Sequence, residues 1–136
     1  MKKYLYSVLT LMIIISCGSA DKVEIKSLEF RIAETEPADS LEEQTMKYTG
    51  QVFYLHKKSD LSEANITATK MVDWNDSEAI ELKFNEEGTK LLAELTRNNI
   101  GKRIGMVLNG ELVSAPIVRA EIPNGTALIP ILKKDN

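Results

Sequence analysis

The chain has 136 residues and a formal net charge of −3, with 17 basic residues, 20 acidic residues and a single cysteine. This length suits one domain that buries its own hydrophobic core. The acidic balance, without a basic stripe, argues against nucleic acid as a partner, and one cysteine excludes a disulfide within the chain.

The first segment is typical of a secretory signal peptide. Lys2 and Lys3 precede an apolar run from Tyr4 to Ile15, and small residues follow. Twelve residues of helix cover about 18 Å, whereas the hydrocarbon core of a bilayer is roughly 30 Å thick. The run is therefore too short to be a transmembrane helix.

The end of this run, Ile14-Ile15-Ser16-Cys17, resembles the lipobox of bacterial lipoproteins, in which the cysteine is acylated and becomes the new N-terminus. The resemblance implies a lipoprotein signal peptide over residues 1–16, lipidation of Cys17 and a lipid-anchored tether over residues 17–27. An ordinary signal peptide with an incidental cysteine is the alternative. Loss of residues 1–16 leaves 120 residues and a net charge of −5, because Lys2 and Lys3 are removed and no acidic residue is.

The first half of the mature chain reads mainly as strands and loops. Alternating apolar residues predict a strand over residues 28–33, and the polar stretch 34–50 predicts a long loop. Residues 51–56 predict a short strand. Residues 59–62 are expected to begin a short helical turn, with Ser62 capping residues 63–65. Two further strands, 67–72 and 79–84, are expected to flank the turn WNDSE, with Ile80, Leu82 and Phe84 pointing to one side.

The clearest helix follows these strands. Asn85 is a suitable N-cap, Glu86 and Glu87 complement the positive end of the helix, and Gly101 is placed to close it in a left-handed conformation. The narrow apolar stripe formed by Leu91, Leu92 and Leu95 suits packing of one face onto a sheet.

The last part of the chain predicts two hairpins. Asn109-Gly110 predicts a tight turn between strands over residues 103–108 and 111–115. Both positions of such a turn require positive φ, which Asn and Gly adopt readily. A second pair, residues 117–122 and 126–131, flanks Pro123-Asn124-Gly125. Residues 104–108 are apolar or small on both faces, so we expect this strand to be internal. The fold class that results is α+β: a mostly antiparallel sheet with one main helix packed across it and a short helical turn.

No catalytic or metal site can be assembled from the sequence. One cysteine and one histidine, His56, cannot build a zinc site, and nothing places His56 beside Cys17 as a base. Residues 73–78 lack the glycine and the distant glutamate of a calcium loop, so a solvated hairpin turn is expected there. The pairs Glu42-Glu43 and Glu86-Glu87 are poor acid/base dyads. We therefore expect no enzyme activity, metal or cofactor.

Several stretches resemble one known family: FRIAETEP from Phe30, YLHK from Tyr54, and above all FNEEGTKLLAELTRNNIGKRIGMVLNGELVSAPIV and IPNGTALI. They are similar to the head subdomain of the first periplasmic domain of SecD, the accessory subunit of the bacterial preprotein translocase. The resemblance covers residues 28–129 and implies a SecD head-like α+β domain over residues 28–132, followed by a polar tail over residues 133–136.

In SecD this subdomain is thought to touch exported polypeptide. The family normally continues into a base subdomain and a proton-driven membrane bundle, whereas this sequence stops at Asn136, so no motor role is expected. The resemblance implies a lipid-anchored, non-enzymatic binding module on the extracytoplasmic side of a membrane of the bacterial envelope. Its expected partners are unfolded polypeptide or a translocase or envelope protein. A structural or inhibitor-type lipoprotein that reuses the head fold is the alternative.

The sequence suggests two surfaces for such a partner, a sheet edge and a groove beside the Leu91/Leu92/Leu95 helix. An extended peptide could add a strand to the first or bury alternate side chains in the second. Trp74 is the large aromatic residue expected to be exposed, either as a contact residue or as a lid over the sheet edge.

Overall fold

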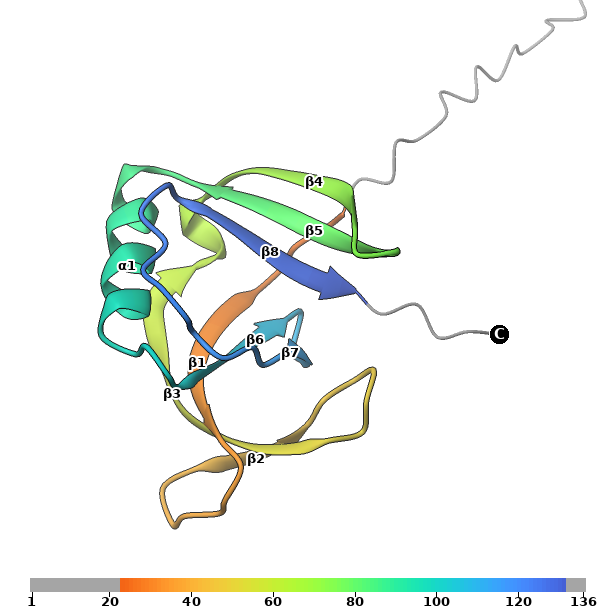
Figure 1. Cartoon of the computed structure of the whole chain (residues 1–136), viewed down its shortest axis with the longest axis vertical. Helices are drawn as coiled ribbons and strands as arrows, with labels where there is room; N and C mark the ends of the chain where they lie inside the picture. Colours follow the sequence, from red (N-terminus) through yellow and green to blue (C-terminus); the bar gives the residue numbers. More distant parts are fainter. Residues whose placement is uncertain (1–22, 132–136) are drawn as a thin grey trace, which may run out of the picture.

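The computed structural model describes residues 23–131 (Figure 1). The predicted signal peptide, Cys17, the first part of the tether and the tail over residues 133–136 lie outside these residues. The elements in chain order are β1 (Leu28–Glu34), β2 (Glu42–Thr45), β3 (Val52–Ser62), the 3-10 helix η1 (Glu63–Asn65), β4 (Ile66–Trp74), β5 (Ser77–Phe84), α1 (Glu86–Arg97), β6 (Arg103–Leu108), β7 (Glu111–Ser114) and β8 (Thr126–Ile131).

The strands form two sheets. The larger sheet has the order β2-β3-β1-β6-β7, the smaller one has the order β4-β5-β8, and the paired strands are antiparallel. The α+β class is therefore confirmed in outline, whereas the expectation of one sheet is wrong. Strand pairing depends on contacts between residues far apart in the chain. The hydrophobic periodicity of a strand does not indicate which other strand it pairs with.

One core joins both sheets and the helix. Phe30 of β1 and Phe84 of β5 meet edge to face with 6.1 Å between ring centroids, and Leu92 of α1 packs on the same cluster. The alternation predicted for β5 is confirmed, because Ile80, Leu82 and Phe84 are buried. A second, smaller cluster covers the other face of the larger sheet; its buried members are Ala33, Phe53, Leu55, Val107, Leu112 and Ala115.

Helix α1 has the predicted start. The Asn85 side chain accepts a hydrogen bond from the Gly88 N–H at 2.8 Å, which satisfies one of the free donors of the first turn. The helix ends with Asn98 as its C-cap, and Gly101, three residues further on, has the expected positive φ of 86°. Leu92 is fully buried while Leu91 and Leu95 are half-buried, so the stripe does pack one face of the helix.

The hairpin at Asn109-Gly110 is also as predicted. The two residues have φ of 50° and 83°, and they join β6 to β7. Strand β6 lies inside the larger sheet, as the apolar character of both its faces indicated. The strand predicted over residues 117–122 is wrong: one isolated bridge, between Arg103 and Ile117, is all the β-pairing the described segment has.

Two expectations near the start of the domain need correction. The predicted loop over residues 34–50 contains the short strand β2, and β3 is longer than expected because it continues through residues 59–62. Ser62 is the N-cap as predicted, and its hydroxyl accepts the Ala64 N–H at 3.3 Å. The helical turn itself therefore begins at Glu63, after the strand ends.

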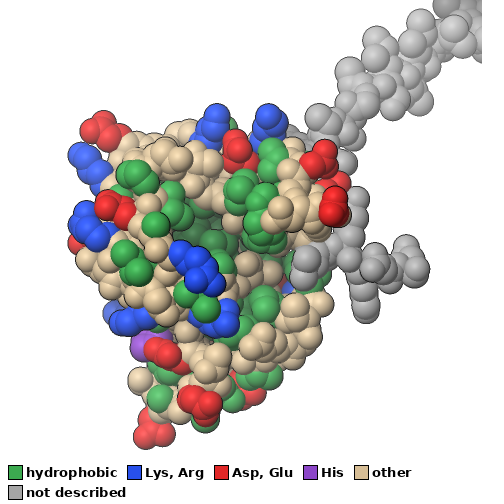
Figure 2. All heavy atoms as spheres, viewed as in Figure 1, with side chains coloured by type: hydrophobic (Ala, Val, Ile, Leu, Met, Phe, Trp, Pro, Cys, Tyr) green, Lys and Arg blue, Asp and Glu red, His purple; other side chains and the backbone are tan. Residues whose placement is uncertain are grey.

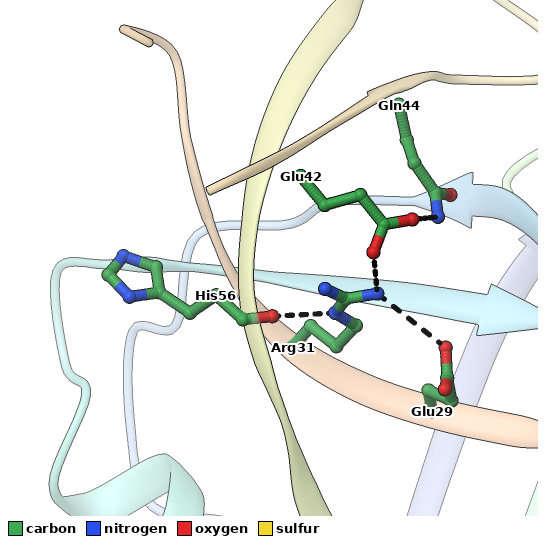
Figure 3. A network of polar contacts seen from close by, with 5 residues as sticks. All are labelled: Glu29, Arg31, Glu42, Gln44 and His56. Carbon is green, nitrogen blue, oxygen red and sulfur yellow. Dashed lines mark hydrogen bonds and ion pairs between the residues drawn. The ribbon is translucent and has the colours of Figure 1, made fainter. Parts of the chain in front are cut away.

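Arg31 explains why β2 forms. Its side chain, 11% exposed, starts on β1 and passes β3 to reach β2, where it donates a hydrogen bond to Glu42 at 3.1 Å (Figure 3). Its Nε atom donates to the His56 carbonyl oxygen at 2.6 Å, at a point where the β1–β3 register is shifted. Gln44 holds the other Glu42 oxygen at 2.9 Å. A guanidinium carried by one strand and hydrogen-bonded to two others fixes the relative positions of all three.

The part of the expected tether that the structure describes is docked on the domain. Val23 and Ile25 pack against the main core. The Asn109 side chain accepts hydrogen bonds from the N–H groups of Lys26 and Ser27 and donates one to the Glu24 carbonyl. We call residues 23–27 the strap. These five residues of the expected tether are therefore held against the domain, because Asn109 serves both the turn and the strap.

Replacing Asn109 with glycine is expected to lower the free energy of unfolding by about 1–2 kcal/mol. Glycine keeps the positive φ of the turn, so the loss comes from the three side-chain hydrogen bonds to the strap. Urea unfolding measures the change, and amide exchange at Lys26 and Ser27 should become faster. If exchange at both amides stays as slow as in the parent protein, Asn109 does not hold the strap.

Candidate binding groove

An apolar groove of about 540 Å³ opens beside α1. Its floor comes from Phe30 of β1, Leu92 of α1 and Ile104 and Met106 of β6, which are buried core residues. Residues 116–122 form one wall, and β8 with Glu81 of β5 forms the other. Figure 2 shows the recess near the middle of this face, with hydrophobic side chains inside it.

The wall over residues 116–122 is held in place by hydrogen bonds to the chain around α1. The Val118 N–H donates to the Lys102 carbonyl and the Val118 carbonyl accepts the Gly101 N–H, both at 2.8 Å. At the other end, the Ile122 N–H donates to the Thr96 hydroxyl at 2.9 Å, and that buried hydroxyl donates to the Leu92 carbonyl. The groove is therefore formed in advance of any ligand.

The rim of the groove exposes large apolar side chains. Ile117 on one wall is 38% exposed, and Leu128 on the other is 37% exposed. The charged residues that line the groove are Glu81, Arg119 and Glu121, and Glu121 is paired with Arg97 at 3.4 Å. A mainly apolar recess suits a ligand that contributes hydrophobic side chains.

A second groove, of about 420 Å³, lies on the other flank of α1 and faces β3. Leu91 and Leu95 line it together with polar and charged residues, and the buried Ser59 hydroxyl has no hydrogen-bond partner. The helix singled out from the sequence thus borders two grooves. Leu92 belongs to the apolar one, whereas Leu91 and Leu95 belong to the polar one.

The residues considered for chemistry do not come together. His56 pairs with Glu34 at 3.1 Å, and both side chains are about half exposed. Glu42 is bound to Arg31, while Glu86 pairs with Lys90 within the helix. Residues 73–78 form the β4–β5 hairpin, in which Asn75 and Asp76 have positive φ. Within residues 23–131, no group of three or more His, Cys, Asp or Glu side chains is arranged to hold a metal ion.

Local hydrogen bonds lower the pKa of two carboxyl groups in the described region. Bonds from the Glu63 backbone N–H and from the Leu28 N–H hold the pKa of the Glu63 carboxyl below its ordinary value of 4.5. Hydrogen bonds from Gln44 and Arg31 lower the pKa of Glu42 in the same way. Both carboxylates therefore bind their neighbours more strongly in their charged form.

The domain is accordingly expected to lose stability in acid. A carboxyl whose pKa is lower in the folded protein stabilises the fold above pH 4.5, and this contribution is lost as the pH falls through the lowered pKa. Urea unfolding between pH 7 and pH 3 should show a smaller acid-induced loss in Glu63→Gln than in the parent protein. The exposed loop residue Glu36 supplies the control, since Glu36→Gln should follow the parent. Parallel curves for all three proteins would contradict this assignment.

The structure thus defines a two-sheet α+β module built around a preformed apolar groove. The family model of the SecDF P1 head subdomain matches residues 39–133, and the chain belongs to this family. The resemblance found in the sequence is therefore confirmed. None of the helices in residues 23–131 has the length and hydropathy needed to cross a bilayer.

Curated relatives extend well beyond the matched region. Protein translocase subunit SecD of Rickettsia prowazekii is 38% identical over 85 residues, which cover 61% of this chain and 16% of that protein. Protein translocase subunit SecDF of Thermus thermophilus is 46% identical over 50 residues, covering 37% of this chain and 7% of that protein. The chain thus spans only a small part of the length of these relatives.

Solved structures agree with the family assignment. SecDF in its super-membrane-facing form has a TM-score of 0.61 at 28% identity, covering 78% of this chain and 16% of that chain. A second structure, of a membrane component SecDF that enhances protein export, has a TM-score of 0.60 at 26% identity, covering 79% of this chain and 56% of that one.

Proposed function

We propose that this chain is a lipid-anchored extracytoplasmic binding module whose apolar groove receives extended segments of exported polypeptides. The observation that carries the proposal is the preformed groove, with a buried apolar floor and the exposed side chains of Ile117 and Leu128 on its rim. Membership of the SecDF head family supports the link to export, since a structurally similar SecDF is a membrane component that enhances protein export.

The apolar lining of the groove suits polypeptide segments of many different sequences. Its lining is mainly apolar, so a bound segment would be recognised chiefly by its apolar side chains. Unfolded segments also lose conformational entropy when they bind. We therefore expect affinities on the order of micromolar or weaker.

Titration of the purified protein with unfolded secretory segments tests this proposal. Leu128→Glu and Ile117→Glu place a charge on the apolar rim and should each weaken binding about tenfold or more. Ile100 is a matched control, because it is 55% exposed and lies outside the groove. Ile100→Glu should bind like the parent protein. Equal binding by all four proteins would exclude the groove.

The same titration distinguishes the export role from the alternative role of a structural or inhibitor-type lipoprotein. A structural or inhibitor-type lipoprotein would ignore unfolded segments and bind one folded envelope protein tightly. Recovery of such a single partner from membranes, with no response to the secretory segments, would replace the export role with this alternative.

The anchor in this proposal is an acyl group on Cys17. Cys17→Ser should leave the protein unacylated, either retained as precursor or released from the membrane. Mass spectrometry of the mature N-terminus measures the modification directly. An unmodified mature N-terminus at a residue other than Cys17 would refute the anchor while leaving the groove assignment intact.

A further inference from the structure

Among residues 23–131, no strand pairs with the outer edge of β4. Strand β4 is an outer strand of the smaller sheet, and β5 is its neighbour. The Phe84 N–H donates to the Gly125 carbonyl, so Phe84 and every second residue of β5 before it face β8. The backbone N–H and C=O groups of the intervening β5 residues point toward β4. They form hydrogen bonds with the backbone of their β4 partners, residues 68, 70, 72 and 74. Thr69, Met71 and Asp73 therefore turn their N–H and C=O groups outward.

The other sheet edges are shorter or partly blocked. On β8, Pro130 has no N–H and the Thr126 N–H donates to the Asn124 side chain. On β7, the Leu112 carbonyl already accepts the Lys47 N–H. Strand β2 is four residues long, whereas β4 is nine residues long and has no proline. The β4 bulge lies at its start, between Ile66 and Ala68, so residues 68–74 are a regular edge that is open to strand addition.

The side chains along this edge are half-buried or exposed. Residues 68, 70, 72 and 74 lie on the face of the sheet that points away from the core, and Trp74 is 40% exposed there. Met71, on the opposite face, packs on the rim of the core and is only half-buried. A strand added beside β4 would bury these groups as well as satisfy the backbone.

We propose that the strand added to β4 is β4 of a second copy of this chain, antiparallel and with Met71 opposite Met71. In this register Lys70 lies opposite Val72 and Ala68 lies opposite Trp74, so no like charges meet and the large ring covers the smallest side chain. Thr69 and Asp73 also lie opposite each other, and the outward groups of residues 69, 71 and 73 can form six backbone hydrogen bonds.

The edge favours this register over its two neighbours. The arrangement centred on Lys70 would bring two lysines directly opposite each other, which destabilises a strand pair, and the one centred on Val72 would place Thr69 opposite the turn residue Asn75 and form fewer backbone hydrogen bonds. The pairing is isologous, because each copy contributes the same residues, and it therefore closes at a dimer. It forms one six-stranded sheet and leaves the groove on the β8 side of each copy accessible, so it does not depend on the proposed export role.

Single cysteine substitutions in the full-length chain, in its membrane, test the contact. Met71→Cys should form a disulfide-linked dimer, since residues facing each other in a hydrogen-bonded pair have Cα atoms about 5.5 Å apart. Thr69→Cys should not, because Thr69 of the two copies would be about 14 Å apart. Lys70→Cys should form a link only in the register centred on Lys70. The parent chain, run beside these variants on a non-reducing gel, shows any link made by Cys17.

Linkage through Met71→Cys alone supports the proposal. Linkage through Lys70→Cys alone, equal linkage at all three positions, or no linkage above the parent overturns it. Adducts of Met71→Cys with other proteins, in place of the dimer, also overturn it and identify β4 as a site for a different chain.

Two substitutions of opposite charge at Val72, each made in the Met71→Cys variant, provide a second test. Val72→Glu places a carboxylate opposite Lys70 of the second copy, whereas Val72→Lys places an ammonium there. Two symmetry-related pairs change together, so the dissociation constants of these two variants should differ by about tenfold or more, with Val72→Glu the tighter. Equal dimer fractions in the two variants would refute the register.

Discussion

Phe30→Ala is expected to lower the free energy of unfolding by about 4 kcal/mol, the largest stability effect that we predict for this chain. Phe30 is 1% exposed on β1 of the larger sheet and contacts Phe84 of the smaller one. The change removes the hydrophobic burial of a whole ring and leaves a cavity where the two sheets meet. Urea or thermal unfolding of the purified protein measures it.

Phe30→Leu is the control for this experiment. Leucine keeps most of the buried volume, so its cost should be nearer 1 kcal/mol. Both variants should unfold in one transition, because a single core links the two sheets. A cost below 1 kcal/mol for Phe30→Ala, or separate transitions for the two sheets, would contradict the shared core.

Gly125→Ala is expected to cost about 3 kcal/mol. Gly125 precedes β8 with φ of 70°, a conformation that costs an alanine roughly 1–2 kcal/mol. A Cβ atom there would also overlap the Thr89 side chain. Thr89 cannot easily move away, because its hydroxyl donates to the Asn85 carbonyl at 2.8 Å in the first turn of α1. The overlap adds to the conformational cost.

Gly110→Ala separates the two contributions. Gly110 has φ of 83°, but a Cβ atom there would meet open space, so only the conformational cost of about 1–2 kcal/mol applies. In the double variant Gly125→Ala/Thr89→Ala, the overlap is relieved and the two changes should be non-additive. Equal costs for Gly125→Ala and Gly110→Ala, measured by thermal unfolding, would refute the contact with Thr89.

The elements predicted correctly from the sequence are those whose signals are local. The alternation in β5, the Asn85 cap of α1 and the Asn109-Gly110 turn each depend on neighbouring residues only. Their geometry therefore does not depend on the tertiary fold and can be predicted without it. The Asn85 cap and the Asn109-Gly110 turn also lie in the block from Phe84 that carried the family resemblance, which the family model confirmed.

Strand β2 could not be predicted because its residues are not apolar. Glu42, Glu43 and Thr45 are exposed, so the strand has no buried face that could appear as a pattern. It forms because β3 offers a partner and because Arg31, eleven positions earlier, binds Glu42. A contact of this kind depends on the tertiary fold, and no local propensity reveals it.

A groove beside α1 was predicted, but its wall over residues 116–122 was missed for a related reason. Ile117, Val118 and Ile122 were interpreted as strand residues, although Pro116 and Pro123 bracket the segment and limit its pairing. In the structure these apolar side chains line the groove, and the backbone bonds to the ends of α1 and β6 instead of joining a sheet. The two prolines were the available signal that the segment is irregular.

The most direct test of the proposed function is site-specific photocrosslinking of the full-length chain in living bacteria. A photoreactive residue at position 128, on the rim of the groove, should form a ladder of adducts with many exported polypeptides. The same residue at position 100, exposed but outside the groove, should form few or none. A single adduct of fixed mass at position 128, or equal ladders at both positions, would contradict a groove that receives exported chains.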